Sequence, residues 1–115
     1  MKLVVFTSDS IRHKYLANTL SKQVDDTLVI SEIPPTHNNV ELDSSSPLVK
    51  EHFALRKSAE LRIFKGNENF LPKTITLQYK EASSKSIFLK IKNFVPDVMI
   101  VFGSSILKGD ILSLL

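Results

Sequence analysis

The sequence predicts an α/β domain with a Rossmann-like parallel sheet and helices on both faces. Short apolar runs typical of strands alternate along the chain with helical or polar stretches, and this rhythm is the one produced by right-handed crossovers between parallel strands. The runs are apolar at successive positions, as in strands that are covered on two sides. The 115 residues suffice for one domain, which we assign to residues 1–115.

The first two strands are expected over residues 3–6 and 27–33, with a helix over residues 11–22 between them. The polar cluster of residues 7–10 follows the first strand and offers candidate N-caps for this helix, namely Ser8, Asp9 and Ser10. Two prolines end the second strand, and residues 36–46 are polar and turn-rich, which predicts a loop.

A long helix is expected over residues 47–65, with Pro47 in its first turn and Gly66 after its end. Its apolar positions follow the helical period only loosely. A short third strand is expected over residues 74–77, because this stretch is rich in β-branched residues.

A helix is expected over residues 83–94, followed by a fourth strand over residues 98–102, which Pro96 introduces in an extended conformation. Four apolar side chains of this helix should be buried: Ile87, Phe88, Ile91 and Phe94. The first and fourth strands are the most apolar, so we expect them at the centre of the sheet.

Composition excludes several classes of protein. The chain is 43% hydrophobic and 23% charged, as is ordinary for a soluble globular domain. No apolar run is long enough for a membrane span, and the N-terminus lacks the apolar core of a signal peptide. Without cysteine, disulfides and thiolate metal sites are impossible. We therefore expect a cytoplasmic protein.

The net charge of +3 conceals a basic middle of the chain, because Lys and Arg outnumber Glu strongly over residues 56–93. Such a segment either faces a phosphate-bearing partner or forms solvated surfaces. No aromatic residues of the kind that stack on bases are interleaved with it.

The expected sheet predicts where a site would lie. Open parallel sheets bind ligands beyond the carboxyl ends of the two strands between which the strand order reverses. The first and fourth strands are followed by Ser8-Asp9-Ser10 and by Gly103-Ser104-Ser105-Ile106. These two segments should flank the crevice.

The familiar catalytic motifs are missing. The first strand is not followed by a GxGxxG turn, which argues against NAD or FAD, and there is no Walker loop. The three histidines, His13, His37 and His52, do not have the spacing of a metal site. Ser104 and Ser105 do not lie in the GxSxG turn of hydrolases. The residues alone thus predict a crevice without an acid–base or nucleophile set.

Two stretches carry a resemblance to a known family. "PDVMIVFGSSILKGDIL", residues 96–112, resembles the fourth-strand region of the formyltransferases, which include methionyl-tRNA formyltransferase, glycinamide ribonucleotide transformylase and the sugar N-formyltransferases. "EHFALRKSAELRIFKG", residues 51–66, resembles a less-studied branch of that family. The resemblance covers nearly the whole chain.

The resemblance implies transfer of a formyl group from 10-formyltetrahydrofolate to an amine. It implies that the loop after the fourth strand binds the pterin ring through its backbone, with Gly103, Ser104, Ser105, Ile106 and Leu107 as cofactor-binding residues. Ile106 and Leu107 either form an apolar wall for the ring or only plug the end of the sheet. By position, Ser8, Asp9 and Ser10 match the segment that contacts the amine acceptor, which is a sugar nucleotide, a ribonucleotide or an aminoacyl-tRNA.

The family's catalytic Asn, His and Asp lie beyond this strand, and the chain has no Asn-x-His motif, so no catalytic residue is expected within it. We expect the first half of a formyltransferase domain, truncated after the fourth strand, inactive alone and prone to self-association through an exposed sheet edge. Two alternatives remain: a non-catalytic binding or interaction module, and a small nucleic-acid binder that uses the basic middle.

Overall fold

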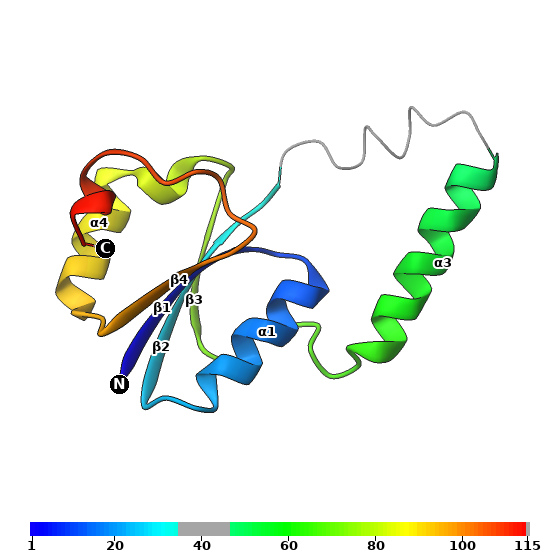
Figure 1. The fold of residues 1–115 in the computed structure, drawn as a ribbon, viewed down its shortest axis with the longest axis horizontal. Coiled ribbons are helices and arrows are strands. Elements are labelled where there is room, and N and C mark those ends of the chain that lie inside the picture. Colours follow the sequence, from blue (N-terminus) through cyan, green and yellow to red (C-terminus); the bar gives the residue numbers. More distant parts are fainter. Residues whose placement is uncertain (35–46, 115) are drawn as a thin grey trace.

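Four parallel strands form a sheet in the spatial order β3-β2-β1-β4 (Figure 1). The computed structural model describes residues 1–34 and 47–114. The strands span Lys2–Ser8 (β1), Asp26–Glu32 (β2), Lys73–Leu77 (β3) and Val98–Val101 (β4). The helices span Ile11–Ser21 (α1), Pro47–Ile63 (α3) and Lys85–Phe94 (α4), and short 3-10 helices span Glu81–Ser83 (η1) and Gly109–Leu114 (η2). The predicted α/β class with a Rossmann-like parallel sheet is confirmed.

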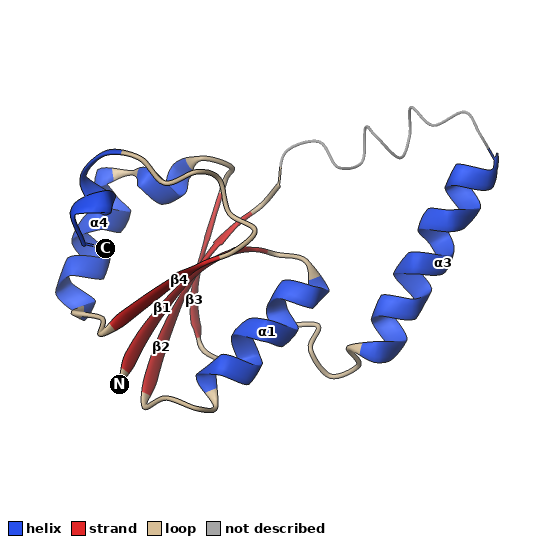
Figure 2. Ribbon diagram, viewed as in Figure 1, coloured by secondary structure: helices blue, strands red, loops and turns tan. Residues whose placement is uncertain are grey.

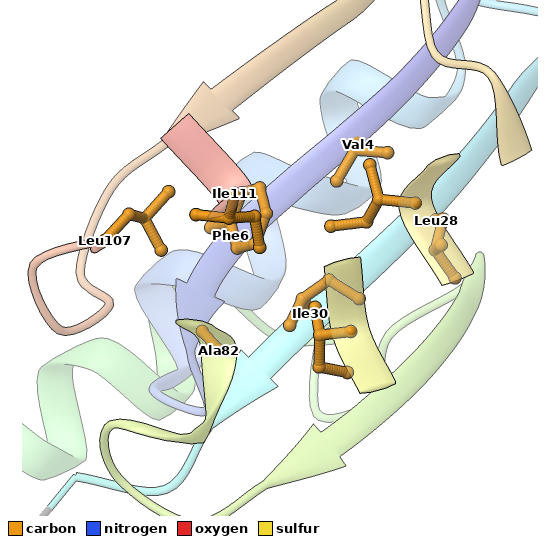
Figure 3. Packing of buried hydrophobic residues seen from close by; sticks show 9 residues of the cluster. Val4, Phe6, Leu28, Ile30, Ala82, Leu107 and Ile111 are labelled. Atoms are coloured by element: carbon orange, nitrogen blue, oxygen red, sulfur yellow. The ribbon is translucent and has the colours of Figure 1, made fainter. Parts of the chain in front are cut away.

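Two apolar layers cover the two faces of the sheet, because successive side chains of a strand point to opposite sides. On one face, β1 and β2 pack against α4, η1 and the C-terminal segment through one cluster: Val4, Phe6, Leu28, Ile30, Ala82, Ile87, Ile91, Leu107 and Ile111 (Figure 3). On the other face, the smaller cluster is Leu3, Val5, Ala17 and Val29, where Ala17 belongs to α1. Burying each large apolar side chain stabilises the fold by about 1.5–3 kcal/mol.

Helix α1 also holds the connection that leads into β3. Asn18 is buried on α1, and its side-chain amide donates to the backbone oxygen of Asn69 over 3.0 Å and accepts from the backbone N–H of Leu71 over 2.7 Å. A buried amide requires such partners, because an unpaired one would cost free energy. The pair of bonds therefore fixes the start of β3 against α1.

Helix α3 stands apart from the sheet and contributes no buried residue (Figure 2). Several of its apolar side chains lie in solvent, among them Leu48 at 76% and Ile63 at 69% exposure. The loose helical period in its sequence agrees with this, because a helix without a continuous apolar stripe has no face to bury. The consequence is that α3 does not cover the sheet over β2 and β3.

The element boundaries differ from the expectation at several places. Thr7 and Ser8 belong to β1 rather than to the turn, because the ladder with β2 continues to the pair of Ser8 with Glu32. Helix α4 begins at Lys85, after the N-cap Ser84, and only two of its four predicted core residues are fully buried, Ile87 and Ile91. The loop predicted over residues 36–46 lies outside the described residues.

The predicted central place of the fourth strand is wrong. Within the part of the chain that the structure describes, β4 pairs with β1 alone and forms an edge, whereas β2 takes the interior place beside β1. The reason is visible in burial, since β2 is buried at every position after its first and β4 at none. The predicted adjacency of β1 and β4, and the reversal of strand order between them, are confirmed.

Among the described residues, no helix combines the length and the apolar character required to cross a membrane.

The open edge of β4 leads to a prediction about self-association. Val98 and Val101 are exposed there, and an unpaired apolar edge is a template for strand pairing. We expect the chain to form dimers or larger species at tens of micromolar, roughly the range in which exposed edges associate. Val101→Lys should shift it towards monomer, because a charge on the edge opposes pairing. Sedimentation velocity measures both.

The matched control is Leu89→Lys on α4, which places the same charge at a similarly exposed apolar position away from the edge. This variant should associate as the unmodified chain does. If the unmodified chain is a monomer, or if both substitutions change association equally, the edge of β4 is not the surface through which the chain associates.

Candidate functional site

The strand order reverses between β1 and β4, where the sequence predicts the ligand crevice. The segments after these two strands diverge to opposite faces of the sheet, as they do at the point where open parallel sheets bind ligands. Ser8 ends β1 and residues 9–10 follow it, and residues 103–107 come shortly after β4. Phe102 extends the pairing beyond β4, because its N–H donates to the backbone oxygen of Phe6 over 2.9 Å. The loop therefore starts directly at Gly103.

Glu32 anchors this loop from the opposite side of β1. It is the last residue of β2 and is 1% exposed. Its carboxyl oxygens accept from the backbone N–H of Ser105 over 2.6 Å and from the Ser105 hydroxyl over 2.8 Å. They also accept from the backbone N–H of Ala82 in η1 over 3.0 Å. One buried side chain thus joins β2, η1 and the loop after β4.

Gly103 lies against the imidazole ring of His13. Its φ of +79° belongs to the left-handed region that favours glycine, and a Cβ at this position would overlap the ring. The ring also packs edge-on against Phe102, with centroids 5.4 Å apart and an interplanar angle of 75°. Helix α1 can therefore approach the loop this closely only because residue 103 is glycine and has no side chain.

His13 and Ser8 form a hydrogen-bonded pair at the end of β1. The Ser8 hydroxyl and His13 Nδ1 are 2.5 Å apart. The hydroxyl also accepts from the backbone N–H of Ser10 at 3.4 Å, which leaves its own proton for the imidazole. Burial and the charge of Arg12 lower the pKa of His13, and the charge of Asp9 opposes them. The neutral ring is therefore favoured in the folded chain.

The predicted acceptor-binding residues have different surroundings. Ser8 is buried and engaged with His13, and Ser10 caps α1, where its hydroxyl accepts from the backbone N–H of His13 over 3.4 Å. Asp9 between them is exposed. Of this segment, Asp9 is the side chain that faces solvent with its charge available.

The predicted cofactor-binding residues differ in how exposed they are. Ser105 and Leu107 are buried, and Leu107 belongs to the core cluster beside Ile111. Ile106 is 82% exposed. The Ser104 hydroxyl donates to the backbone oxygen of Ser105 over 3.0 Å. Leu107 therefore plugs the end of the sheet, whereas Ile106 and the backbone at Gly103 and Ser104 remain accessible.

Sequence reasoning missed both residues that hold the loop. Glu32 carries a signal that could have revealed it, because a carboxyl group inside an otherwise apolar strand must find donors. His13 carries none, since a histidine one turn into a helix is most often a surface residue. Within the described ranges, no group of three or more His, Asp or Glu side chains could hold a metal ion.

Comparison with known proteins finds no matching family model, no matching curated protein and no matching solved structure.

The first prediction from the site concerns Glu32. Glu32→Ala removes the acceptor of three hydrogen bonds and leaves the N–H groups of Ser105 and Ala82 unpaired in a buried place. The free energy of unfolding should fall by about 2–4 kcal/mol, since each buried donor without a partner costs roughly 1–3 kcal/mol. Urea denaturation followed by circular dichroism measures this. Glu51→Ala on exposed α3 should change it by no more than about 0.5 kcal/mol, and equal effects would refute the anchoring role.

The second prediction concerns His13. Because its pKa is lowered in the folded chain, the unfolded state takes up a proton first as pH falls. The contribution of His13 to stability is thus fully present above its ordinary pKa near 6.5 and is lost as pH falls below that value. Urea denaturation at pH 8 and pH 5.5 should show this loss in the unmodified chain and less of it in His13→Gln.

His52→Gln, on the exposed helix α3, is the matched control and should retain the full pH dependence of the unmodified chain. If His13→Gln retains it as well, the neutral imidazole does not contribute to the fold.

Proposed function

We propose that the chain is the N-terminal portion of a folate-dependent formyltransferase domain. In this proposal the loop of residues 103–107 binds 10-formyltetrahydrofolate as cosubstrate, and an amine acceptor approaches the segment after β1. The observation that supports it is the fixed loop at the point where the strand order reverses, which is where open parallel sheets bind ligands. The resemblance of residues 96–112 to the corresponding region of the family points to the same loop.

The backbone of the loop suits recognition of a flat heterocycle with polar edges. Among the described residues, the N–H groups of Gly103, Ser104 and Ile106 donate to no protein acceptor. A pterin edge presents both donors and acceptors, which free backbone groups of a fixed loop can match. The exposed side chain of Ile106 supplies an apolar surface beside them.

Asp9 is the residue of the β1 segment best placed to meet the acceptor. Its exposed carboxylate would attract the ammonium form of an amine, whereas Ser8 and Ser10 are engaged within the fold. A sugar nucleotide, a ribonucleotide and an aminoacyl-tRNA all remain acceptors consistent with this contact. The chain contributes binding and positioning in this proposal and no catalytic residue, so the 115 residues alone should not turn over.

The interaction module is the second candidate, and the open edge of β4 favours it. The nucleic-acid binder gains less support. Most basic residues of the middle segment lie on α3 or α4, which are far apart on either side of the sheet (Figure 1), and the others lie on β3 or in connections. Arg56 is moreover paired with Glu60, with Nε and Oε1 3.2 Å apart. A single basic surface of the kind that follows a phosphate backbone is therefore not formed by them.

The test is a ligand-detected NMR titration with 5-formyltetrahydrofolate. We expect weak binding, roughly in the millimolar range, about −4 kcal/mol. Gly103→Val should abolish it, because the added side chain would displace His13 and strain the positive φ of the loop. Gly66→Val is the matched control, since Gly66 has the same kind of φ, +90°, but open space around it, and it follows α3 rather than the crevice. The Gly66→Val variant should bind folate as the unmodified chain does.

NAD and a short RNA are the comparators. If folate makes no contact while RNA binds with a steep dependence on salt, the formyltransferase proposal fails and the basic middle becomes the functional surface.

A further inference from the structure

A cavity of about 390 Å³ lies on the α1 side of the sheet, above β2 and β3. Its floor is formed by Ser31 of β2 and by Thr74 and Thr76 of β3, and its rim includes Asp9, Lys14 and Phe70. The cavity exists because α1 covers only part of this face and α3 contributes no buried residue to the rest. Its size falls in the range of roughly 300–1,000 Å³ that is typical of small-molecule pockets.

The floor holds a buried hydroxyl without a partner. Ser31 is 1% exposed, and its Oγ makes no hydrogen bond among the described residues. Thr7, which is paired with Ser31 in the ladder, has an equally unpartnered Oγ1. Such a group costs about 1–3 kcal/mol when it stays unpaired. A side chain that lines a cavity and lacks a partner within the protein indicates a partner that enters the cavity.

The lining defines the chemistry of that partner. Hydroxyls both donate and accept, so a floor of Ser and Thr side chains matches a ligand rich in hydroxyls. The two charges at the rim have opposite sign, which disfavours a simple anion or cation. Lys14 is already held, with Nζ 3.1 Å from the backbone oxygen of Glu68 and 5.7 Å from the centroid of the Phe70 ring. Asp9 is left as an acceptor and Phe70 as an apolar wall.

We propose that this cavity binds a sugar ring, with the Ser31 hydroxyl bonded to one of its hydroxyls and Asp9 accepting from others. The ring is uncharged, carries donors and acceptors around its edge, and offers C–H faces that pack against an aromatic wall. The cavity shares only Asp9 with the proposed folate and acceptor site, so this proposal does not depend on binding of folate at residues 103–107. A free monosaccharide and the ribose of a nucleoside both present such a ring, so either could be the ligand.

The test is a saturation-transfer NMR experiment on the 115-residue chain with D-glucose, D-ribose and uridine as separate probes and inorganic phosphate as the charge control. We expect contact from at least one sugar-bearing probe and none from phosphate. Contact from the free sugars assigns a monosaccharide site, whereas contact from uridine through its ribose protons alone assigns a nucleoside site. Either result supports the proposal.

Ser31→Ala should weaken that contact about five- to tenfold, the effect of losing one hydrogen bond, without unfolding the chain, because the hydroxyl has no partner to lose. Thr27→Val is the matched control. It also removes a buried hydroxyl without a partner, but near the start of β2 and outside the cavity, so binding should not change. Amide NMR spectra verify that both variants are folded.

Three outcomes would overturn the proposal: no contact from any sugar-bearing probe, which would mean a cavity filled by water only; contact that Ser31→Ala leaves unchanged; or stronger contact from phosphate than from the sugars.

Discussion

The buried carboxyl group of Glu32 is the interaction on which the carboxyl edge of the sheet depends. In a parallel sheet every strand ends at the same edge, so the segments that leave the strands there must be held together without hairpins. Glu32 does this across the end of β1, since its donors come from η1 on one side and from the loop after β4 on the other. Leu107 and Ile111 can then close the core above Phe6 because the loop that carries them is fixed at Ser105.

His13 acts on the same loop from the opposite face. Glu32 holds Ser105 on the α4 side of the sheet, and the imidazole ring lies against Gly103 and Phe102 on the α1 side. The loop is therefore restrained at two points only two residues apart, with free backbone groups between and beside them. A loop that is ordered before a ligand arrives loses little entropy on binding. The restraint at Gly103 and Ser105 therefore fixes the backbone of the loop after β4.

Because α3 stands apart from the sheet, the α1-side face over β2 and β3 is left partly uncovered. On the α1 side, β2 and β3 carry hydroxyls where their opposite face carries large apolar side chains. Covering this side with a helix would therefore add little stabilisation from apolar burial. Local features that conflict with packing, such as the buried hydroxyls of Ser31 and Thr7 without partners, are expected at functional sites rather than in ordinary cores. The α4 side of the sheet thus carries the larger apolar cluster, whereas the α1 side carries a smaller cluster beside the hydroxyl-lined cavity.

The sequence by itself determined the class of fold and the order of its elements, because apolar runs, proline and helix caps act locally. The strands predicted at residues 3–6 and 27–33, and the turn predicted after the fourth strand at Gly103, follow from such patterns. Tertiary structure alone decided that β2 takes the interior place beside β1, that α3 does not pack on the sheet and that Glu32 and His13 hold the loop. The physical reason is that these facts depend on contacts between residues far apart in the chain. The position of Glu32 in an apolar strand shows that it needs donors, but no local pattern identifies Ser105 as one of them.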